Sequence, residues 1–315
     1  MKTALITGVS GYLGSHLAKA LKQSNWKVVG IDVQHTINPY IDIFHSCNVT
    51  DPESLHFLFN KIDFNVVFHL AGRIEVGESV KYPTIFWYNN TTGTNTLLNT
   101  MVYWGVKNIV YSSTAGVYKS KTEALKETDE LNPMNNPYAG SKYASELAIR
   151  QSGINHIIFR FFNLAGADPD NEMGECHKPE THLIPRILQN LNNFSIYGND
   201  YDTPDGTCVR DYVHVSDVAN AHVLAAKYLM EGGNSQILNL GTGKGYSVQN
   251  IVALIKEITG KEIKYRYEPR RAGDPPFLIA DVSLSERVLT YQPKHDIISI
   301  IQTANNWQTK NDNNI

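Results

Sequence analysis

Residues 1–14 read MKTALITGVSGYLG, and this stretch decides the fold. The short apolar run over 1–7 predicts a buried strand, glycines stand at 8, 11 and 14, and a helical pattern covers 12–23. Strand, glycine turn and helix in this order are typical of a dinucleotide-binding loop. The three glycines would allow the tight turn, the approach of the pyrophosphate and the packing of helix on sheet. Because the helix N-terminus then faces phosphate, the predicted phosphate-side residues are Gly8, Gly11, Tyr12, Leu13 and Gly14.

Asp32 ends the next apolar run, residues 27–31, and lies eighteen positions after Gly14. A carboxylate at this point accepts hydrogen bonds from the adenosine ribose hydroxyls and repels a 2′-phosphate. No arginine follows in residues 33–35. The sequence therefore predicts NAD, in preference to NADP, as the cofactor.

Residues 138–142 read YAGSK and place a phenol and an ammonium group four positions apart. On a helix, Tyr138 and Lys142 then share one face. A neighbouring cation favours phenolate, so the tyrosine would act as a base at neutral pH. Lowering a phenol pKa from about 10 to about 7 takes about 4 kcal/mol, which is more than one solvated lysine supplies. We expect a cationic nicotinamide in a dry pocket to supply the remainder, so this pair belongs with a cofactor site.

The composition indicates a soluble enzyme. The chain has 315 residues, is 42% hydrophobic and carries a net charge of -3 without a basic block, so neither nucleic acid nor membrane is an expected partner. No apolar run approaches membrane-spanning length. The three cysteines are widely spaced and do not form metal-ligand pairs. We expect idle thiols in a reducing cytoplasm and no metal.

Short apolar runs alternate with helical patterns along the chain. Strands are expected at 4–7, 28–32, 66–70, 108–112, 157–162 and 237–240, and helices at 12–23, 52–61, 90–104 and 141–151. This order predicts an α/β fold with a doubly wound parallel Rossmann sheet and ligands at the C-terminal ends of its strands. Turn-rich residues 165–210 and the segment after 245 predict a smaller α+β substrate-binding lobe. The predicted domains are 1–163 with 211–245, and 164–210 with 246–309, followed by a frayed tail at 310–315.

Residues 3–307 carry a set of motifs that occur together. They are TGxxGxxG at 7–14, HxAG at 69–72, VGES at 76–79, NNxxGT at 89–94, YGNDY at 197–201, DGT at 205–207, VRDYVH at 209–214 and RRxGD at 270–274. With the Thr114, Tyr138 and Lys142 set, this pattern resembles the extended short-chain dehydrogenase/reductase family. The GNDY and RRxGD segments resemble its nucleotide-sugar 4-epimerases in particular.

The resemblance implies reversible 4-epimerisation of UDP-glucose and UDP-galactose through a 4-keto intermediate, with bound NAD. Tyr138 would take the proton of the sugar 4′-hydroxyl, Lys142 would bind the nicotinamide ribose, and Thr114 would bridge phenol and sugar. A threonine at this position could instead be satisfied by the local backbone. The resemblance also implies a homodimer through the helices around 90–104 and 141–151.

Further binding residues follow from the resemblance, position by position. Two arginines would bind the uridine diphosphate as planar forks, and Asp274 would bind the uridine ribose. Leu278 stands where a tyrosine restricts the sugar pocket near carbon 2, so N-acetylated UDP-hexosamines are expected substrates as well. The cofactor-side positions are Asn48, Val49, Leu70, Ala71, Gly72, Arg73, Asn90, Ser112 and Phe162. The substrate-side positions are Asn163, His182, Leu183, Ser195, Ile196, Tyr197, Arg210, Arg271, Asp274 and Leu278.

The chain departs from the family pattern at a few positions. Arg73 and Ile74 stand where the family has a pyrophosphate-facing lysine, Asn48 replaces an aspartate, Lys119 replaces a glycine, and the connection over 32–48 is short. These departures predict weaker cofactor retention and a more open adenine pocket.

Other functions remain open alternatives. Another nucleotide-sugar epimerase, acting on UDP-N-acetylglucosamine, a UDP-uronate or a UDP-pentose, would use the same residues. A dehydratase or decarboxylase would need a carboxylate just after Thr114, where this chain has Ala115 and Gly116. A non-catalytic NAD sensor would have no use for an activated phenol.

Overall fold

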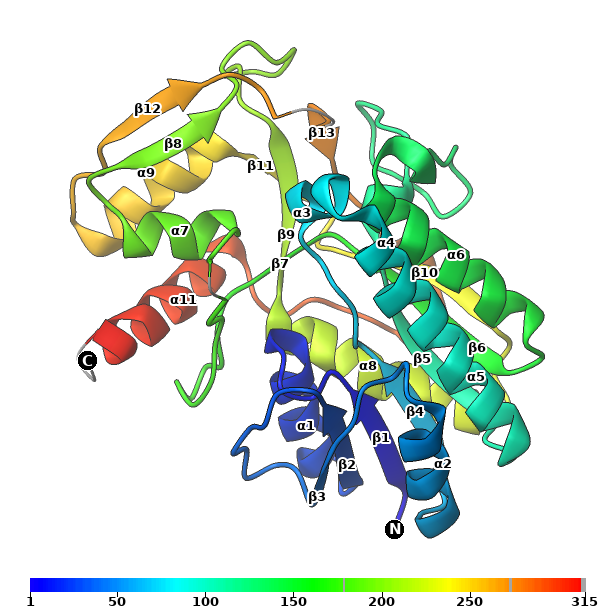
Figure 1. Cartoon of the computed structure of the whole chain (residues 1–315). Helices are drawn as coiled ribbons and strands as arrows, with labels where there is room; N and C mark the ends of the chain where they lie inside the picture. Colours follow the sequence, from blue (N-terminus) through cyan, green and yellow to red (C-terminus); the bar gives the residue numbers. More distant parts are fainter. Residues whose placement is uncertain (178, 272–273, 313–315) are drawn as a thin grey trace. The chain divides into compact units, whose positions relative to one another are not determined.

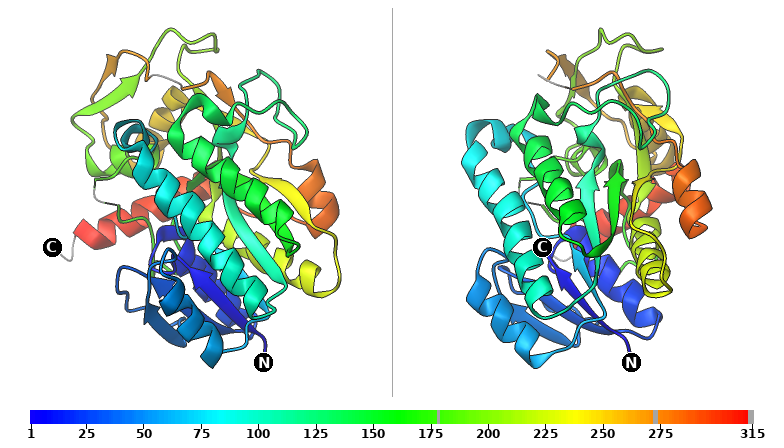
Figure 2. Two further views of the ribbon diagram at one scale, coloured as in Figure 1. Left: turned by 45° about the vertical axis from the view of Figure 1, so that its right-hand side comes forward. Right: turned by 90° about the vertical axis from the view of Figure 1, so that its right-hand side faces the viewer.

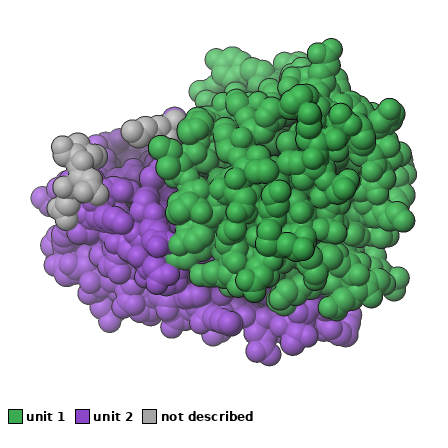
Figure 3. Space-filling view, turned by 90° about the horizontal axis from the view of Figure 1, so that it is seen from below, with its two compact units in different colours: residues 1–119, 130–160, 219–238 green, residues 120–129, 161–218, 239–315 purple. Residues whose placement is uncertain are grey.

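The computed structural model describes residues 1–177, 179–271 and 274–312. The chain forms two compact units (Figure 3). Unit 1 comprises Met1–Lys119, Glu130–Arg160 and Ala219–Leu238, and unit 2 comprises Ser120–Asp129, Phe161–Val218 and Asn239–Ile315. These boundaries place residues 120–129, 161–163, 211–218 and 239–245 in unit 2, whereas the sequence assigned them to the cofactor domain. As a division of function, the predicted domains stay a prediction.

A seven-stranded sheet organises the fold (Figure 1). The pairs β1–β2, β1–β4, β2–β3 and β4–β5 are all parallel, as predicted for a doubly wound sheet. In sheet order the strands are β10 (Gln236–Leu240), β6 (Asn155–Phe161), β5 (Asn108–Thr114), β4 (Val66–His69), β1 (Thr3–Thr7), β2 (Lys27–Asp32) and β3 (Ile43–Ser46). Strand β3 was not predicted, because its sequence IFHS forms a partly exposed edge without the continuous apolar run of the inner strands.

Helices of unit 1 follow the predicted pattern with two differences in their bounds. The helix expected at 90–104 begins within a π-helical turn, η1. The helix expected at 141–151 begins at Pro137, because Asn136 caps it by accepting from the Ala139 amide at 2.9 Å. The helices are α1 (Tyr12–Gln23), α2 (Pro52–Lys61), α3 (Val76–Lys81), α4 (Pro83–Phe86), η1 (Trp87–Thr92), α5 (Gly93–Tyr103), the 3₁₀ turns η2 (Ala115–Val117) and η3 (Pro133–Asn135), α6 (Pro137–Gln151) and α8 (Val215–Met230).

The core of unit 1 lies between the sheet and the helices α2, α5 and α6. In Figure 2, α5 and α6 run side by side. Strand residues Leu5, Val67 and Ile109 pack with Leu97 of α5 and Ile149 of α6, all of them fully buried. Burying a side chain of this size contributes about 1.5–3 kcal/mol. This packing fixes α6, the helix that carries Tyr138 and Lys142, relative to the sheet.

Unit 2 is the smaller α+β part that the sequence predicted. Strands β7 (Asn163–Ala165), β9 (Val209–His214), β11 (Gly245–Ser247) and β13 (Phe277–Leu278) form one sheet. Strands β8 (Phe194–Tyr197) and β12 (Tyr265–Glu268) pair in parallel. The helices are α7 (Leu183–Gln189), α9 (Val248–Thr259), α10 (Ser283–Leu289) and α11 (Ile297–Asp312).

The predicted frayed tail is wrong for residues 310–312. Helix α11 continues to Asp312, and Lys310 donates from Nζ to the carbonyl of Asn171 over 2.7 Å. Buried Ile300 and Ile301 hold the first turns of this helix in the core of unit 2. Residues 313–315 lie outside the described residues. Within the described ranges, the structure has no helix with the length and apolar character needed to span a bilayer.

Candidate active site

The three predicted catalytic residues lie together in unit 1. Helix α6 presents Tyr138 and Lys142, and strand β5 ends at Thr114. Lys142 donates from Nζ to the carbonyl of Ser112 over 2.7 Å, and the Thr114 hydroxyl lies close enough to the Tyr138 phenol to lower its pKa. Thr114 Oγ1 also accepts from the Gly116 amide at 3.0 Å. The threonine thus makes both the contact to the phenol and the local backbone contact.

Burial dominates the electrostatics of this set. It raises the pKa of the Tyr138 phenol, with the Thr114 hydrogen bond acting against it and the charge of Glu75 acting with it. It lowers the pKa of Lys142 to about 8, while Glu146 raises it. Burial thus outweighs the Thr114 effect that lowers the phenol pKa, in line with the expectation that Lys142 by itself does not stabilise phenolate enough. The phenol needs a further positive charge nearby to become a base at neutral pH.

The glycine turn between β1 and α1 has the geometry of a phosphate cradle. Gly8 has φ +74°, and a Cβ there would lie 2.8 Å from the Ala71 amide nitrogen. A Cβ on Gly14 would lie 2.2 Å from the Gly8 carbonyl oxygen. Gly11 is the helix N-cap and has no side chain to accept from the first-turn amides of α1. These observations fit a pyrophosphate at this helix N-terminus.

Asp32 is held at the C-terminal end of β2 by two backbone amides. Its Oδ2 accepts from Ser10 at 3.0 Å and its Oδ1 accepts from Gln34 at 2.9 Å. The carboxylate is therefore fixed beside the glycine turn, and each oxygen retains a lone pair for a ribose hydroxyl. This position fits the predicted role of Asp32 toward the adenosine.

A buried histidine network supports the next loop, which contains Leu70, Ala71 and Gly72. His69 contacts Thr7 Oγ1 through Nδ1 at 2.7 Å and Thr94 Oγ1 through Nε2 at 2.9 Å. The Ala71 amide donates to the same Thr7 oxygen at 3.1 Å. Burial, followed by the charge of Lys142, lowers the pKa of His69 to about 3. His69 is therefore a neutral structural residue that holds this loop against β1.

Asn90 occupies the π-helical turn and fixes the backbone of Arg73. Its Oδ1 accepts from the Arg73 amide at 2.8 Å, and its Nδ2 donates to the Arg73 carbonyl at 3.1 Å and to Ser141 Oγ at 2.9 Å. A Cβ on Gly72 would lie 2.9 Å from Asn90 Oδ1. Asn90 thus acts on the predicted cofactor loop through the backbone, and a direct contact with the cofactor stays a prediction.

The other cofactor-side residues have simpler surroundings. The side-chain oxygen of Asn48 accepts from the Thr50 amide at 3.1 Å. Val49 is buried and packs closely against Gly93, where an added Cβ would lie 2.7 Å from Val49 Cγ2. Phe162 is buried at the end of β6 and belongs to unit 2. Their contacts with a cofactor stay predictions.

A buried ion pair behind the catalytic residues was missed at the sequence level. Glu146 on α6 accepts from Arg160 of β6 at 3.0 Å (Nε) and 2.6 Å (NH2). Ser113 donates to the same carboxylate, and the Arg160 guanidinium lies 4.9 Å from the ring centroid of Tyr118. No motif marks this pair, because its partners meet only when α6 packs on the sheet.

Five of the predicted substrate residues form one connected group in unit 2. Arg210 NH2 lies 3.2 Å from Asp274 Oδ1, and Arg210 NH1 donates to the Val209 carbonyl. Strand β13 places Leu278 beside Arg210 of β9. The guanidinium of Arg271 lies 4.1 Å from the ring centroid of Tyr197, and the Asp274 amide donates to the Arg271 carbonyl at 3.2 Å.

The remaining substrate-side residues occupy separate elements of unit 2. Ser195 and Ile196 precede Tyr197 on β8. Asn163 starts β7, and Leu183 starts α7. His182 is turned toward Glu175 and Glu180. Their substrate contacts stay predictions.

Comparisons with known proteins identify the family of the chain. The model of the NAD dependent epimerase/dehydratase family matches residues 4–241. The UDP-glucose 4-epimerase of Halalkalibacterium halodurans is 38% identical over 96% of this chain and 94% of its own. The UDP-glucose 4-epimerase of Lacticaseibacillus casei is 41% identical over 97% of this chain and 96% of its own.

Solved structures are similar over the same length. A UDP-glucose 4-epimerase of Brucella ovis in complex with NAD has a TM-score of 0.91 and 37% identity, over 97% of this chain and 98% of its own. One from Stenotrophomonas maltophila, with bound NAD and formylated UDP-arabinopyranose, has a TM-score of 0.95 and 32% identity over the whole of both chains. The predicted α/β Rossmann fold is confirmed, and the chain belongs to the NAD dependent epimerase/dehydratase family.

Proposed function

We propose that the chain is an isomerase that interconverts UDP-glucose and UDP-galactose by NAD-dependent 4-epimerisation. The observation that carries the proposal is that helix α6 presents Tyr138 and Lys142 one turn apart, with Thr114 at the end of β5, in the same unit as the glycine turn and Asp32. Relatives named UDP-glucose 4-epimerase, at 38% and 41% identity, bear out the predicted activity. The relative bound to NAD bears out the predicted cofactor.

The chemistry of the chain's own residues follows from their contacts. Bound NAD supplies the oxidant for the first half of the reaction and the reductant for the second. Tyr138 accepts the proton of the sugar 4′-hydroxyl and returns it after the 4-keto sugar has turned over, which inverts carbon 4. Thr114 would hold the phenol, and Lys142 would bind the nicotinamide ribose. Because burial raises the pKa of Tyr138, the phenol would need the positive charge of the bound cofactor to act as a base.

The Arg210 group of unit 2 is suited to a uridine diphosphate. Arg210 is buried, and its guanidinium is oriented by Asp274 and the Val209 carbonyl. Arg210 and Arg271 carry two positive charges, and Asp274 carries one negative charge. The group therefore has an excess positive charge, and planar guanidinium groups match phosphate oxygens in geometry. A relative from Bifidobacterium longum is described in complex with NAD⁺ and UDP, at 32% identity. We assign the diphosphate to the two arginines and the uridine ribose to Asp274.

The decisive experiment is incubation of the purified chain with UDP-glucose, and separately with UDP-galactose, without added reductant. Both reactions should reach the same mixture of 4-epimers. Parallel reactions contain added NAD, because the replacement of the family's lysine by Ile74 predicts that the protein loses bound cofactor more readily. Release of a bound dinucleotide without sugar turnover would reveal a non-catalytic NAD-binding protein, and loss of water from the sugar would reveal a dehydratase.

A broader substrate range is supported by Leu278. This residue is half-buried and lies beside Arg210 in the sheet. We propose that its size leaves room for an acetamido group, so that UDP-N-acetylhexosamines are substrates too. A similar structure, the UDP-Glc/GlcNAc 4-epimerase of Campylobacter jejuni, has a TM-score of 0.83 and 32% identity.

We also propose that the chain forms a homodimer through the helices around 90–104 and 141–151, with neighbouring α3 and α4 beside them, and that it acts in the cytoplasm. Large apolar side chains are exposed on this helical layer, which includes the π-helical turn. They are Val76, Val80, Ile85, Tyr88, Val102, Tyr103 and Leu147. The three cysteines are free thiols, which fits a reducing compartment. Light scattering on the purified protein measures its mass in solution and tests the dimer. The double variant Val102→Glu with Leu147→Glu should be a monomer.

A further inference from the structure

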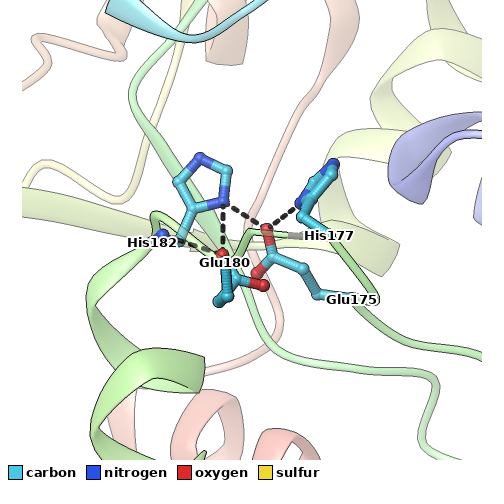
Figure 4. A group of neighbouring side chains, drawn as sticks. All are labelled: Glu175, His177, Glu180 and His182. Carbon is cyan, nitrogen blue, oxygen red and sulfur yellow. Dashed lines mark hydrogen bonds and ion pairs between the residues drawn. The ribbon is translucent and has the colours of Figure 1, made fainter. Parts of the chain in front are cut away.

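Two glutamates and two histidines come together in unit 2 before helix α7 (Figure 4). They are spaced as Glu-x-His-x-x-Glu-x-His: Glu175, His177, Glu180 and His182. One nitrogen or carboxylate oxygen from each residue lies within 4.8 Å of those of the other three. The spacing is visible in the sequence, but the cysteine count gave no reason to look for a metal there.

We infer that this cluster binds a divalent transition-metal ion, with Zn²⁺ as the best match. Metal–nitrogen and metal–oxygen bonds of about 2.0–2.2 Å place the ligand atoms of a tetrahedral site about 3.4 Å apart. Here Glu175 Oε1 lies 2.9 Å from His177 Nδ1, and His182 Nδ1 lies 3.6 Å from Glu180 Oε1. Glu175 Oε1 also contacts His182 Nδ1. The separation of His182 from Glu180 matches that edge, whereas Glu175 and the two histidines lie at hydrogen-bonding distance and would have to move apart slightly to hold the ion.

The donor chemistry selects the class of ion. Calcium and magnesium prefer sites made only of oxygen ligands. Two imidazole nitrogens with two carboxylate oxygens suit zinc and its transition-metal neighbours. Two carboxylates also balance the charge of a divalent ion when both histidines are neutral.

A buried oxygen without a partner points to the same ion. The Glu180 side chain is 4% exposed, and its Oε2 has no hydrogen-bond partner among the described residues. The Glu175 side chain is 6% exposed and lies in the same cluster. Two carboxylates that face each other away from water, one of them incompletely paired, are costly unless a cation joins them. Figure 4 shows the four side chains turned toward one another.

The flanking structure gives the ion a structural role. Trp307 of α11 donates to the Glu175 carbonyl at 3.1 Å, which anchors the first ligand. The last ligand, His182, is the N-cap residue of α7. An ion held between them would close the segment over 175–182 and fix where α7 begins. This role is independent of the NAD chemistry of unit 1.

Calorimetry on EDTA-treated full-length protein with ZnCl₂ tests the site. The experiment uses the Cys176→Ser background, because Cys176 is an exposed thiol beside the cluster and could itself take zinc. We expect one Zn²⁺ per chain. Glu180→Gln and His177→Gln should each weaken binding at least about 10-fold, since even changes to residues that only support metal ligands cost 10–100-fold. His45→Gln, on β3 of unit 1, is the matched control and should bind as the background protein does.

Cobalt gives a second readout that does not require the variants to fold. Co²⁺ added to the Cys176→Ser protein should develop the visible absorption of a four-coordinate ion, and one equivalent of Zn²⁺ should abolish it. His182 is left unchanged, because it is also a predicted substrate contact. The proposal is overturned if the Cys176→Ser protein takes up neither Zn²⁺ nor Co²⁺, or if both variants bind Zn²⁺ as tightly as the His45→Gln control.

Discussion

Lys142 donates from Nζ to the main-chain carbonyl of Ser112 over 2.7 Å, and the same ammonium lies 4.8 Å from the ring centroid of Tyr111. The lysine therefore joins helix α6 to strand β5 where the strand approaches Thr114. Its charge is directed to the strand backbone and an aromatic ring. Under the proposed mechanism, the phenol of Tyr138 therefore needs a further positive charge for its activation.

Replacing Tyr138 with phenylalanine should lower turnover of UDP-glucose at least about 100-fold, because general-base catalysis typically contributes 10²–10⁴. UDP-sugar binding, measured by calorimetry, should remain, since the residues proposed to bind the sugar diphosphate belong to unit 2. Tyr143→Phe, on the same helix α6, is the control and should retain activity. Near-wild-type turnover in Tyr138→Phe would exclude the phenol as the base.

Cofactor-stripped protein should bind NAD at least about 10-fold more tightly than NADP, because hydrogen bonds to a charged group contribute about 1.5–3 kcal/mol. The carboxylate of Asp32 is oriented for this by the amides of Ser10 and Gln34. Asp32→Asn keeps the shape and removes the charge, so the preference should shrink. Equal binding of the two dinucleotides to the wild type would contradict the assignment of Asp32.

Leu278→Tyr should reduce epimerisation of UDP-N-acetylglucosamine at least about 10-fold while sparing UDP-glucose. The tyrosine ring would occupy the space of the acetamido group, and a pocket that lacks room for one small group typically discriminates by such a factor. Leu278→Met preserves the volume and should change neither activity. Rates for both sugars are compared by separating the epimers. A wild type that converts UDP-glucose and leaves the N-acetyl sugar untouched would refute the pocket argument and leave the epimerase proposal standing.

Lowering the pH from 7.5 to 5.5 should destabilise the protein by about 1.4 kcal/mol through His69 alone. Its pKa falls from 6.5 in the unfolded chain to about 3 in the fold. The unfolded state therefore binds a proton that the folded state excludes, and stability is lost as the pH falls below 6.5. Urea unfolding at both pH values should show a smaller pH effect in His69→Gln. The exposed control His35→Gln should behave as the wild type; an equal pH effect in His69→Gln would contradict the assignment.

Glu146→Leu should destabilise the fold by about 3–5 kcal/mol, because it leaves the buried guanidinium of Arg160 without its partner. The double variant Glu146→Leu with Arg160→Met should recover most of the loss, since apolar residues of similar volume replace a buried ion pair at little cost. Urea unfolding measures both. A double variant as unstable as Glu146→Leu would show that the pair is not what holds α6 to β6.

Several features followed from the sequence because their causes are local. The tight turn at Gly8 requires φ +74°, and glycine is the residue that adopts this conformation without strain. Helix α2 begins and ends as predicted, because Asp51 caps it by accepting from the Glu53 and Ser54 amides and Pro52 occupies its first position. The phenol and ammonium of α6 share a face because they lie four residues apart.

Other features failed or were missed because they depend on packing between distant segments. The edge strand β3 is defined by its pairing with β2, as in Val29 with Ile43. Helix α11 reaches Asp312 because its first turns, with Ile300, are anchored in the core of unit 2. Hydrophobic periodicity reports burial along one element and does not report which element covers it.

By itself, the sequence determined the glycine turn and the α/β fold, because periodicity, turn chemistry and short spacings act within a few residues. It also predicted the NAD-selective carboxylate and the catalytic set, which stay predictions. Only the tertiary structure decided that Lys142 donates to Ser112, that Asn90 fixes Arg73, and how the donor atoms from Glu175 to His182 gather. The physical reason is that hydrogen bonds and ligand sets need atoms within about 3 Å. Chain folding alone brings distant residues to that separation.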